Sequence, residues 1–338
     1  MKAAVIESFG GPDVLVVREV AEPTPGAGEV VVEVSAAGVN FPDLLVVEGS
    51  YQNLPELPFS PGKEIAGIVC EVGPGVERTK PGDRVMAQIE YGGYAERVTV
   101  PEAQLVPLTD DIPFTDAAAF GLGYITAHFA LVRRARVRPG ETVLVTGAGG
   151  GVGRAGVQLA KALGATVIAA TRDGNRGRLA KELGADHVVT AGPQMRDEVR
   201  ELTGGRGADV VLELVGGDVF AAALRATAWE GRLVVIGFAS GDVPVIKAGH
   251  VLVKNLAVMG LQVSDYRDKE PESVRSALES MLELYREGRL RVHVDRTYPL
   301  EGAGEALRAL RSGAVLGKVV LIPGQPQPGE RRLRRESW

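Results

Sequence analysis

The sequence has 338 residues, of which 45% are hydrophobic and 24% charged, a composition that excludes a disordered chain. At about 150 residues per domain, this length predicts roughly two domains. The 38 Lys and Arg residues against 43 Asp and Glu residues give a net charge of −5, with no basic face to indicate nucleic-acid binding. The 44 glycines are nearly twice the usual share of ~7%, which indicates many turns and close backbone approaches.

The N-terminus and the cysteine content favour a cytoplasmic protein. The opening residues, MKAAVIESFGG, lack the apolar core of a signal peptide. The stretch 117–132 is uncharged but is too short to span a bilayer, so no membrane association is expected. Cys70 is the single cysteine, which excludes an intrachain disulfide. We expect its side chain to be a small buried hydrophobe within an apolar strand.

The first third of the chain predicts a compact antiparallel β region. Short β-forming runs are separated by Gly- and Pro-rich turns such as residues 23–26 and 81–83. Many short strands with regular turn spacing are typical of a barrel. The expected strands are residues 2–7, 14–20, 29–36, 65–72, 83–87 and 95–100.

From residue 116 onward, the pattern changes to an alternation of helices and strands. Apolar runs such as Thr-Val-Leu-Val at 142–145 are continuous, as in strands that are covered on both faces. Such an alternation predicts an α/β fold, with a Rossmann doubly wound parallel sheet. The expected strands are 142–145, 166–170, 187–189, 210–214 and 232–236, and the expected helices are 116–134, 152–163, 177–183, 194–202 and 219–227.

Beyond residue 263, two amphipathic helices (272–286 and 304–310) and a strand (318–322) do not extend the alternation. We therefore assign residues 1–122 and 263–322 to a discontinuous, mainly β catalytic domain. Residues 123–262 form the dinucleotide-binding domain. Residues 323–338, rich in Pro and Gly and then in Arg, are expected to be a disordered tail, with contact to a partner or anionic lipid as the alternative.

A glycine-rich turn stands between the strand at 142–145 and the helix that follows. It reads Ala148-x-Gly150-x-x-Gly153, with Ala in place of the usual first Gly. Gly150 would let a pyrophosphate approach the backbone, and Gly153 would let the helix pack closely on the sheet. The helix N-terminus, at Gly151 and Val152, offers N–H groups to phosphates. The turn therefore predicts dinucleotide binding.

The end of the next strand indicates which dinucleotide binds. NAD sites usually place an acidic residue there, whereas NADP sites use a neutral or basic one. Thr171 and Arg172 occupy this position, and Arg176 follows. Because a guanidinium suits a 2′-phosphate, NADPH is favoured. The alternatives are that these arginines only form a solvated helix face, or that Asp173 holds a ribose hydroxyl.

Several motifs occur in the order typical of one enzyme family. They are Gly38-Val-Asn40, Pro61-Gly-Lys-Glu-Ile-Ala-Gly67, Lys80-Pro-Gly-Asp-Arg-Val85, Gly92-Gly-Tyr-Ala-Glu96, the glycine turn, Val235-Ile-Gly-Phe238 and Gly317-Lys-Val-Val320. With these motifs, the chain resembles the medium-chain dehydrogenases/reductases over residues 1–322. It is most similar to their zinc-independent NADPH:quinone oxidoreductase branch. The resemblance implies that the first domain is a GroES-like barrel.

The zinc-binding members of that superfamily hold the metal with a Cys, a His and a third Cys or Asp. The matching positions here are Asn40, Lys63 and Leu122, and none of these supplies a zinc ligand. The four histidines are scattered without ligand spacing. We therefore expect no metal site, and a zinc alcohol dehydrogenase is the disfavoured alternative.

A reductase without a metal must use an acceptor that itself spreads the incoming charge. Quinones and α,β-unsaturated carbonyls do so, and hydrogen-bond donors then suffice to stabilise the developing oxyanion. We expect an NADPH-dependent reductase that transfers hydride to a quinone in a cleft between the domains. The alternatives are an enone or 2-enoyl-CoA reductase, or an NADPH-binding protein without turnover.

The resemblance suggests Asn40, Tyr51 and Lys63 as catalytic residues. Asn40 could hydrogen-bond substrate or cofactor, or could only fix a turn. Tyr51 matches an active-site tyrosine and could donate a proton, or could be a surface aromatic residue. Lys63 could stabilise an oxyanion, or could pair with Glu64 or Asp43.

Further residues are expected around the nicotinamide. Thr126 would hydrogen-bond the nicotinamide end, and Gly237, followed by Phe238, would allow close approach to the ring. Lys318 is a weaker candidate, with a structural role as the alternative. Leu45 stands where the family has a second tyrosine, which suggests a more apolar pocket.

Residues 250–260 are expected to form the edge of the cofactor-domain sheet. In relatives such an edge often pairs with its copy in a second chain, so we expect a homodimer.

Overall fold

The computed structural model describes residues 1–324, and the chain divides into two compact units. Unit 1 comprises residues 1–122, 269–276 and those from 292 onward, and unit 2 comprises residues 123–268 and 277–291. The sequence-based division has the same first boundary but places 263–268 and 277–291 in the first domain. Tertiary contacts account for this difference: the backbone N–H of Arg291 donates to Oε1 of Gln158 at 2.7 Å, and the Tyr124 hydroxyl donates to the Arg291 carbonyl at 2.8 Å.

Unit 1 is built mainly from β-strands, with two helices of its own. Helix α2 (Phe114–His128) runs from unit 1 into unit 2, as does α9 (Pro271–Arg286). The strands are β1 (Lys2–Val5), β2 (Val16–Glu19), β3 (Glu29–Val39), β4 (Glu64–Val72), β5 (Arg84–Gln88), β6 (Arg97–Pro101), β7 (Leu105–Pro107), β14 (Val294–Pro299) and β15 (Lys318–Ile322), and the helices are α1 (Phe41–Val47) and α10 (Ala303–Ser312). Short 3-10 turns occupy Pro12–Val14, Glu102–Gln104 and Leu300–Gly302.

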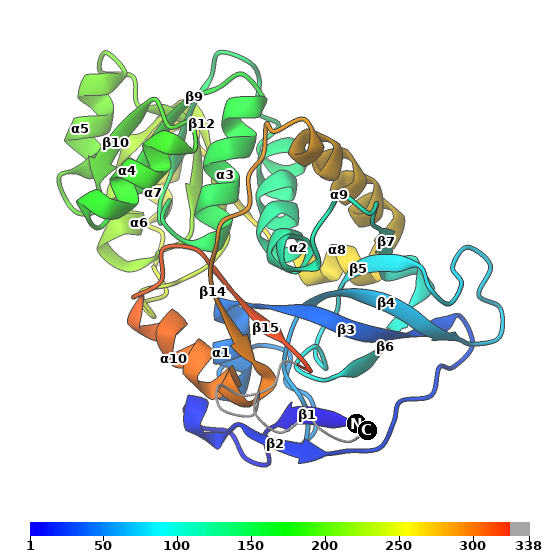
Figure 1. The fold of residues 1–338 in the computed structure, drawn as a ribbon. Coiled ribbons are helices and arrows are strands. Elements are labelled where there is room, and N and C mark those ends of the chain that lie inside the picture. The colour runs from blue at the N-terminus through cyan, green and yellow to red at the C-terminus, as the bar shows by residue number, and fades with distance from the viewer. Residues whose placement is uncertain (325–338) are drawn as a thin grey trace, which may run out of the picture. The chain divides into compact units, whose positions relative to one another are not determined.

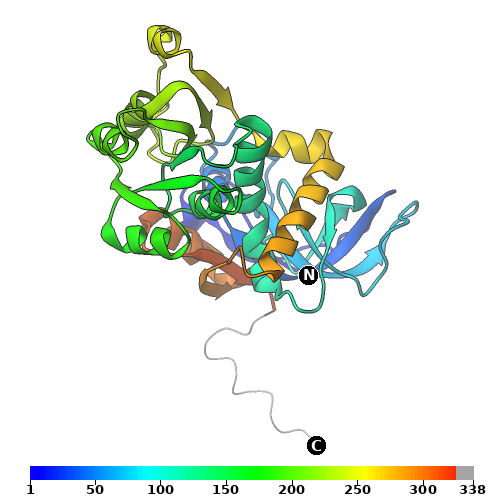
Figure 2. The ribbon, with the colours of Figure 1, turned by 90° about the horizontal axis from the view of Figure 1, so that it is seen from above.

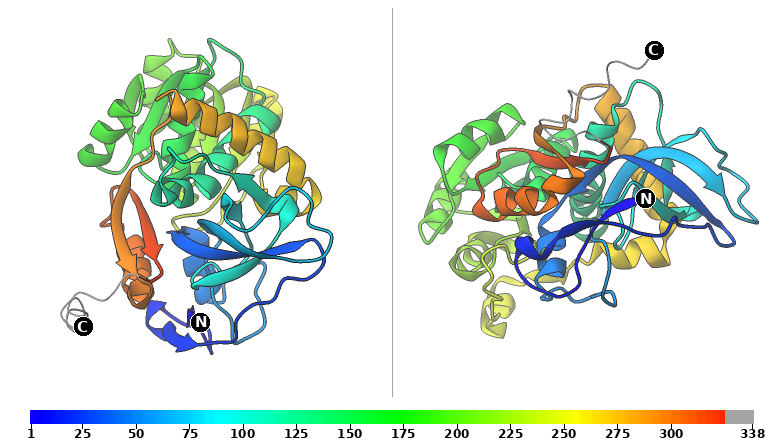
Figure 3. Two further views of the ribbon diagram at one scale, coloured as in Figure 1. Left: turned by 45° about the vertical axis from the view of Figure 1, so that its right-hand side comes forward. Right: turned by 60° about the horizontal axis from the view of Figure 1, so that its bottom comes forward.

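The strands of unit 1 form one large sheet and one separate pair. The large sheet has the order β14-β15-β3-β4-β5-β7, with β6 also on β3, and β1 pairs with β2. All pairs are antiparallel except β14 with β15. Figure 3 shows β14 and β15, in orange and red, side by side with α10 against them. The expected antiparallel region is confirmed, and β7 and β14 are additional strands.

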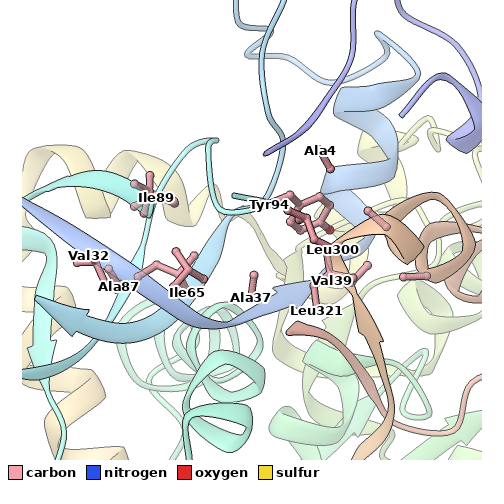
Figure 4. Close-up of a cluster of buried hydrophobic side chains, with 14 of the residues drawn as sticks. Ala4, Val32, Ala37, Val39, Ile65, Ala87, Ile89, Tyr94, Leu300 and Leu321 are labelled. Atoms are coloured by element: carbon pink, nitrogen blue, oxygen red, sulfur yellow. The ribbon is translucent and has the colours of Figure 1, made fainter. Parts of the chain in front are cut away.

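The core of unit 1 lies where β3 crosses its neighbours. In Figure 4, Val32 and Val39 of β3 lie near Ile65, Ala87 and Leu321 from the flanking strands. All five side chains are buried. Side chains alternate across a strand, and the register of β3 with β4 shifts between Val34 and Ala36, so that Val32 and Val39 reach the same cluster.

Unit 2 contains a six-stranded parallel sheet surrounded by helices (Figure 1). The strands are β8 (Thr142–Val145), β9 (Thr166–Thr171), β10 (His187–Thr190), β11 (Ala208–Glu213), β12 (Thr227–Val235) and β13 (Ala257–Gly260). The helices are α3 (Gly151–Ala162), α4 (Gly174–Glu182), α5 (Met195–Leu202), α6 (Gly217–Ala226), α7 (Ala248–Lys254) and α8 (Val263–Lys269). A π-helical turn, Phe129–Arg134, continues α2.

The strand order of unit 2 is β10-β9-β8-β11-β12-β13. Counted from β8, this is the order 3-2-1-4-5-6 of the Rossmann fold, so the predicted doubly wound sheet is confirmed. The helices cover both faces. Leu144 of β8 packs in a core with Phe220 of α6, whereas its neighbour Val145, which points to the other face, lies close to Gly156 of α3.

One expectation is confirmed in part, since β13 is the edge strand of this sheet, and another is wrong. Within residues 250–260, only β13 is a strand, and residues 248–254 form helix α7, beside the sheet edge seen in Figure 2. Apolar runs of this length do not distinguish a strand from a short helix. Cys70 is exposed on the solvent face of β4, where its thiol lies 3.4 Å from the Val31 carbonyl.

No helix within residues 1–324 is long and apolar enough to cross a membrane. Of the predicted tail 323–338, only Pro323 and Gly324 are described, and the rest lies outside the described residues.

Candidate active site and nucleotide-binding turn

The glycine turn of unit 2 follows β8 and leads directly into α3. Gly147 has a φ of +58°, which favours glycine, and Gly150 is the N-cap of α3. A Cβ on Gly153 would lie 2.2 Å from the Gly147 carbonyl oxygen, so this position requires glycine. A Cβ on Gly150 would meet only that same oxygen, at 3.4 Å, which leaves the outer side of the turn open. The inner side of the turn, at Gly153, is therefore closely packed, and its outer side, at Gly150, is accessible.

Ala148 ties this turn to the neighbouring strand. Its side chain is fully buried, and its backbone N–H donates to the carbonyl of Ala170 on β9 at 3.2 Å. The first N–H groups of α3, at Gly151 and Val152, have no partner within the helix, as at any helix start. The predicted turn residues thus come together at the carboxyl end of β8.

The residues that follow β9 surround Asp173, which caps α4. Arg176 donates its backbone N–H to this carboxylate at 3.0 Å and its guanidinium at 2.5 Å. The pKa of Asp173 is lowered, first by that backbone bond and then by the two arginines. The Arg176 side chain is 14% exposed and lies against Gly149, whereas the Arg172 side chain is 60% exposed, 3.6 Å from Asp173. Thr171 is buried.

A buried carboxylate that sequence reasoning missed supports the neighbouring turn. Glu213 ends β11, and Oε1 of its carboxylate accepts the backbone N–H groups of Val215 and Gly216 at 3.0 Å and the Thr146 hydroxyl at 3.2 Å. Burial raises the pKa of Glu213, against these hydrogen bonds. Its signal in the sequence is an acidic residue directly after the apolar run Val210–Leu212 of β11.

The remaining predicted cofactor residues of unit 2 lie on two other elements. Thr126 is buried on α2. Gly237 and Phe238 follow β12, where a Cβ on Gly237 would come no closer than 3.7 Å to its nearest neighbour, the carbonyl oxygen of Leu214. The Phe238 ring is partly exposed.

Unit 1 contains a buried polar cluster around Glu64, at the start of β4. Asn40 donates its side-chain amide to Oε1 of Glu64 at 2.8 Å and accepts from Nζ of Lys318 at 2.6 Å. Lys318 also donates to Glu64 at 2.5 Å. The other oxygen of Glu64 accepts the backbone N–H of Leu122 at 2.7 Å. A Cβ on Gly38 would lie 2.3 Å from Glu64, so the motif glycine makes room for this carboxylate.

Lys63 forms an ion pair with Glu90, and not with Glu64 or Asp43 as the sequence suggested. Its ammonium donates to the Glu90 side chain at 2.7 Å and to the Glu90 carbonyl at 3.0 Å. It also lies 4.5 Å from the centroid of the Tyr51 ring, a cation–π contact. Lys63 directly precedes β4, and its side chain bonds to other partners than that of Glu64. Lys63 therefore connects Tyr51 to Glu90.

A second buried acid, Asp43, lies in the first turn of α1. Its Oδ2 accepts the backbone N–H of Asn40 at 2.8 Å and the Tyr94 hydroxyl at 2.9 Å, while Oδ1 has no hydrogen-bond partner. Burial raises the pKa of Asp43 to about 6, although Lys63 and these hydrogen bonds favour its charged form. The pKa of Tyr94 is raised well above its usual range. Neither Tyr94 nor Glu90 was a sequence-based candidate.

Comparison with known proteins shows which family the chain belongs to. Residues 26–110 match the model of the "Alcohol dehydrogenase GroES-like domain" family, and residues 151–283 match that of the "Zinc-binding dehydrogenase" family. A "Quinone oxidoreductase-like protein 2 homolog" from Nematostella vectensis is 39% identical over 300 residues, which cover 88% of this chain and 82% of that protein. The chain belongs to the quinone oxidoreductase family of medium-chain dehydrogenases/reductases.

Solved structures of the family agree closely with this fold. The structure of mycobacterial Rv1454c complexed with NADPH matches with a TM-score of 0.91 at 34% identity, and covers 96% of this chain and 100% of that chain. Escherichia coli quinone oxidoreductase complexed with NADPH matches with a TM-score of 0.90 at 32% identity, with the same coverage. The resemblance and the GroES-like and Rossmann domains predicted from the motifs are thereby confirmed.

The zinc named in one family description does not fit the residues of this family member. The three positions that match zinc ligands hold the Asn40 amide, the Lys63 ammonium and the hydrocarbon side chain of Leu122, none of which is a zinc donor. Lys63 moreover places a buried positive charge there. Within residues 1–324, no group of three or more His, Cys, Asp or Glu side chains could hold a metal ion.

Proposed function

We propose that this protein is an NADPH-dependent reductase that transfers hydride to quinones or similar conjugated carbonyl compounds without a metal ion. The glycine turn carries the proposal, because its exterior at Gly150 is open to a pyrophosphate while Gly153 closes its interior. Two family members of the same fold are described as complexed with NADPH.

The chain's own residues would hold the cofactor at the carboxyl end of β8. Gly150, Gly151 and Val152 present the N-terminus of α3 to the pyrophosphate. Arg172, which is largely exposed, and Arg176 would bind the 2′-phosphate. When bound, NADPH supplies the hydride.

Of the predicted catalytic residues, we assign contact with substrate to Tyr51. Its ring lies over the Lys63 ammonium, which fixes the ring, and its hydroxyl would donate a hydrogen bond to the developing oxyanion. Asn40 uses both its amide nitrogen and its oxygen within unit 1, on Glu64, Gly38 and Lys318. We therefore assign Asn40 and Lys63 as positioning residues.

The reaction is tested by following the absorbance of NADPH with an ortho-quinone, a simple enone and crotonyl-CoA in parallel. Rapid oxidation with the quinone is the expected result. Consumption of only the enone or the thioester would refute the quinone assignment and leave the cofactor assignment standing. Tight NADPH binding without oxidation by any acceptor would refute the enzyme assignment.

The role of Tyr51 is tested with two variants. Tyr51→Phe keeps the ring over Lys63 and removes only the hydroxyl, so kcat should fall on the order of tenfold or more while the unfolding midpoint stays unchanged. Tyr51→Leu removes the ring as well and should also lower stability. Unchanged kcat and KM in Tyr51→Phe would exclude the hydroxyl from the reaction.

We also propose a homodimer that forms through β13 and α7. β13 is an edge strand of the sheet, and in the segment 245–254, which leads into and includes α7, Val245 is 91% exposed and Leu252 76% exposed, which is unusual for large apolar side chains. A second copy of the chain would cover them.

Light scattering should give a mass of twice the 35.6 kDa of one chain. The double variant Val245→Asp/Leu252→Asp should be monomeric, whereas the control Leu202→Asp on α5 should remain a dimer. A one-chain mass at micromolar concentration would contradict the proposal.

A further inference from the structure

A polar pocket of about 630 Å³ lies in unit 2 at the amino end of the parallel sheet. Glu141, directly before β8, and Asp209, near the start of β11, are among its lining residues. The glycine turn follows the other, carboxyl end of β8. A volume of this size is within the range of small-molecule sites, roughly 300–1,000 Å³.

The pocket is lined by an excess of positive charge. Five of its residues are arginines, Arg133, Arg134, Arg136, Arg138 and Arg232, and three are acidic, Glu141, Asp209 and Glu230. Two of the acids are already engaged. Glu141 accepts a two-pronged pair of bonds from Arg232 at 2.9 and 2.7 Å, and Asp209 accepts the backbone N–H of Thr142 at 2.7 Å.

Neither Arg134 nor Arg136 forms an ion pair within the described part of the chain. Arg136 is exposed, and Arg134 is partly buried. The Nε–H of Arg134 is buried without a hydrogen-bond partner. A buried guanidinium donor without an acceptor costs free energy, and an anion in the pocket would supply the acceptor.

The pocket also contains two residues in a left-handed backbone conformation and an exposed tryptophan. Of the three non-glycine residues with a left-handed φ within residues 1–324, two line the pocket, Arg136 at +50° and Glu230 at +58°. Such conformations cluster at binding sites. Trp229, next to Glu230, is 64% exposed at the same pocket. A free indole face of this size suits stacking with a flat ring.

We propose that this pocket binds a small anion that carries a phosphate group joined to a flat aromatic ring. Arg134 and Arg136 would bind the phosphate, and Trp229 would stack on the ring. Since the glycine turn lies at the opposite end of β8, this site is separate from the nucleotide-binding turn and does not depend on the proposed reaction.

The proposal is tested by calorimetric titration of the full chain with 1-naphthyl phosphate and with inorganic phosphate. The wild type should bind the naphthyl ester more tightly. Arg136→Ala and Arg134→Gln should each weaken its binding on the order of tenfold or more, as expected for a charge-assisted bond. Arg225→Ala, an exposed arginine of α6 outside the pocket, is the matched control and should not change the affinity.

Trp229→Ala should bring the affinity for the naphthyl ester down to that for inorganic phosphate. Because Arg136 and Trp229 are exposed, Arg136→Ala and Trp229→Ala should keep the wild-type unfolding midpoint. The proposal is overturned if the wild type binds neither probe at millimolar concentration, if it binds both probes equally, or if the Arg136→Ala variant retains full affinity for the naphthyl ester.

Discussion

The ammonium of Lys318 lies 2.5 Å from Oε1 of Glu64, although 254 positions separate the two residues and both are buried. The pair joins the last strand of the unit 1 sheet to β4, and Asn40 bonds to both members. Glu64 also holds the backbone of Leu122. The cluster thus connects the sheet, the start of α1 and helix α2 within one unit.

Breaking this pair from one side should be costly, because it leaves a buried charge without its partner. We expect Lys318→Met to lower the free energy of unfolding by about 3 kcal/mol or more. The double variant Lys318→Met/Glu64→Gln should recover much of that loss. The exposed pair of Arg18 and Glu7 provides the control, and Arg18→Ala should change stability by less than about 1 kcal/mol. Denaturant unfolding measures all of these variants, and equal losses in the single and double variants would contradict the prediction.

Asp43 should make stability depend on pH. Its pKa is raised to about 6 in the folded protein, so between about pH 4 and pH 6 the native state keeps a proton that the unfolded state has lost. Because the native state then binds more protons, the free energy of unfolding falls as the pH rises through this window.

We expect the stability of the wild type relative to Asp43→Asn to fall by about 2 kcal/mol between pH 4 and pH 7. Tyr94→Phe removes a hydrogen bond that favours the charged carboxylate, so the window should extend to higher pH. Parallel stability curves for the wild type and Asp43→Asn would show that Asp43 titrates in the folded protein as it does in the unfolded one.

Two glycines of the nucleotide-binding turn should respond differently to alanine. Gly153→Ala places a Cβ 2.2 Å from a backbone oxygen, so it should destabilise the fold by about 2 kcal/mol or more. Gly150→Ala meets only one atom, at 3.4 Å, and should cost at most about 1 kcal/mol as a changed N-cap.

The affinity for NADPH should nevertheless fall strongly in Gly150→Ala, because the new methyl group occupies the open side of the turn. Thermal unfolding and a titration of NADPH fluorescence measure the two effects. Gly249→Ala, with open space around its Cβ, is the control. Unchanged NADPH affinity in Gly150→Ala would mean that the pyrophosphate lies elsewhere.

Arg172→Ala should weaken NADPH binding by about 1–3 kcal/mol and leave NADH binding nearly unchanged, since only NADPH carries the 2′-phosphate. Arg178→Ala, in which the lost guanidinium bonds to the side chain of Asn175, is the matched control and should affect neither cofactor. Calorimetric titration with both cofactors measures the difference. An equal loss for NADPH and NADH would refute the assignment of Arg172.

Local sequence patterns determined much of this protein. The glycine turn between β8 and α3 could be predicted because its requirements are local: a buried strand, a backbone that approaches itself at Gly153, and a helix start. The alternation of apolar runs likewise predicted the parallel sheet, since each strand and helix carries its own periodicity. The order of short motifs identified the family.

Only the tertiary structure decided which charged groups meet. Lys63 pairs with Glu90 rather than with its neighbours, and Lys318 pairs with Glu64 across most of the chain, because strand pairing brings together residues that are remote in sequence. The raised pKa of Asp43 and the arginine pocket at the amino end of the sheet have the same origin. Burial and the electric field at a side chain depend on what packs around it, and no local pattern encodes that.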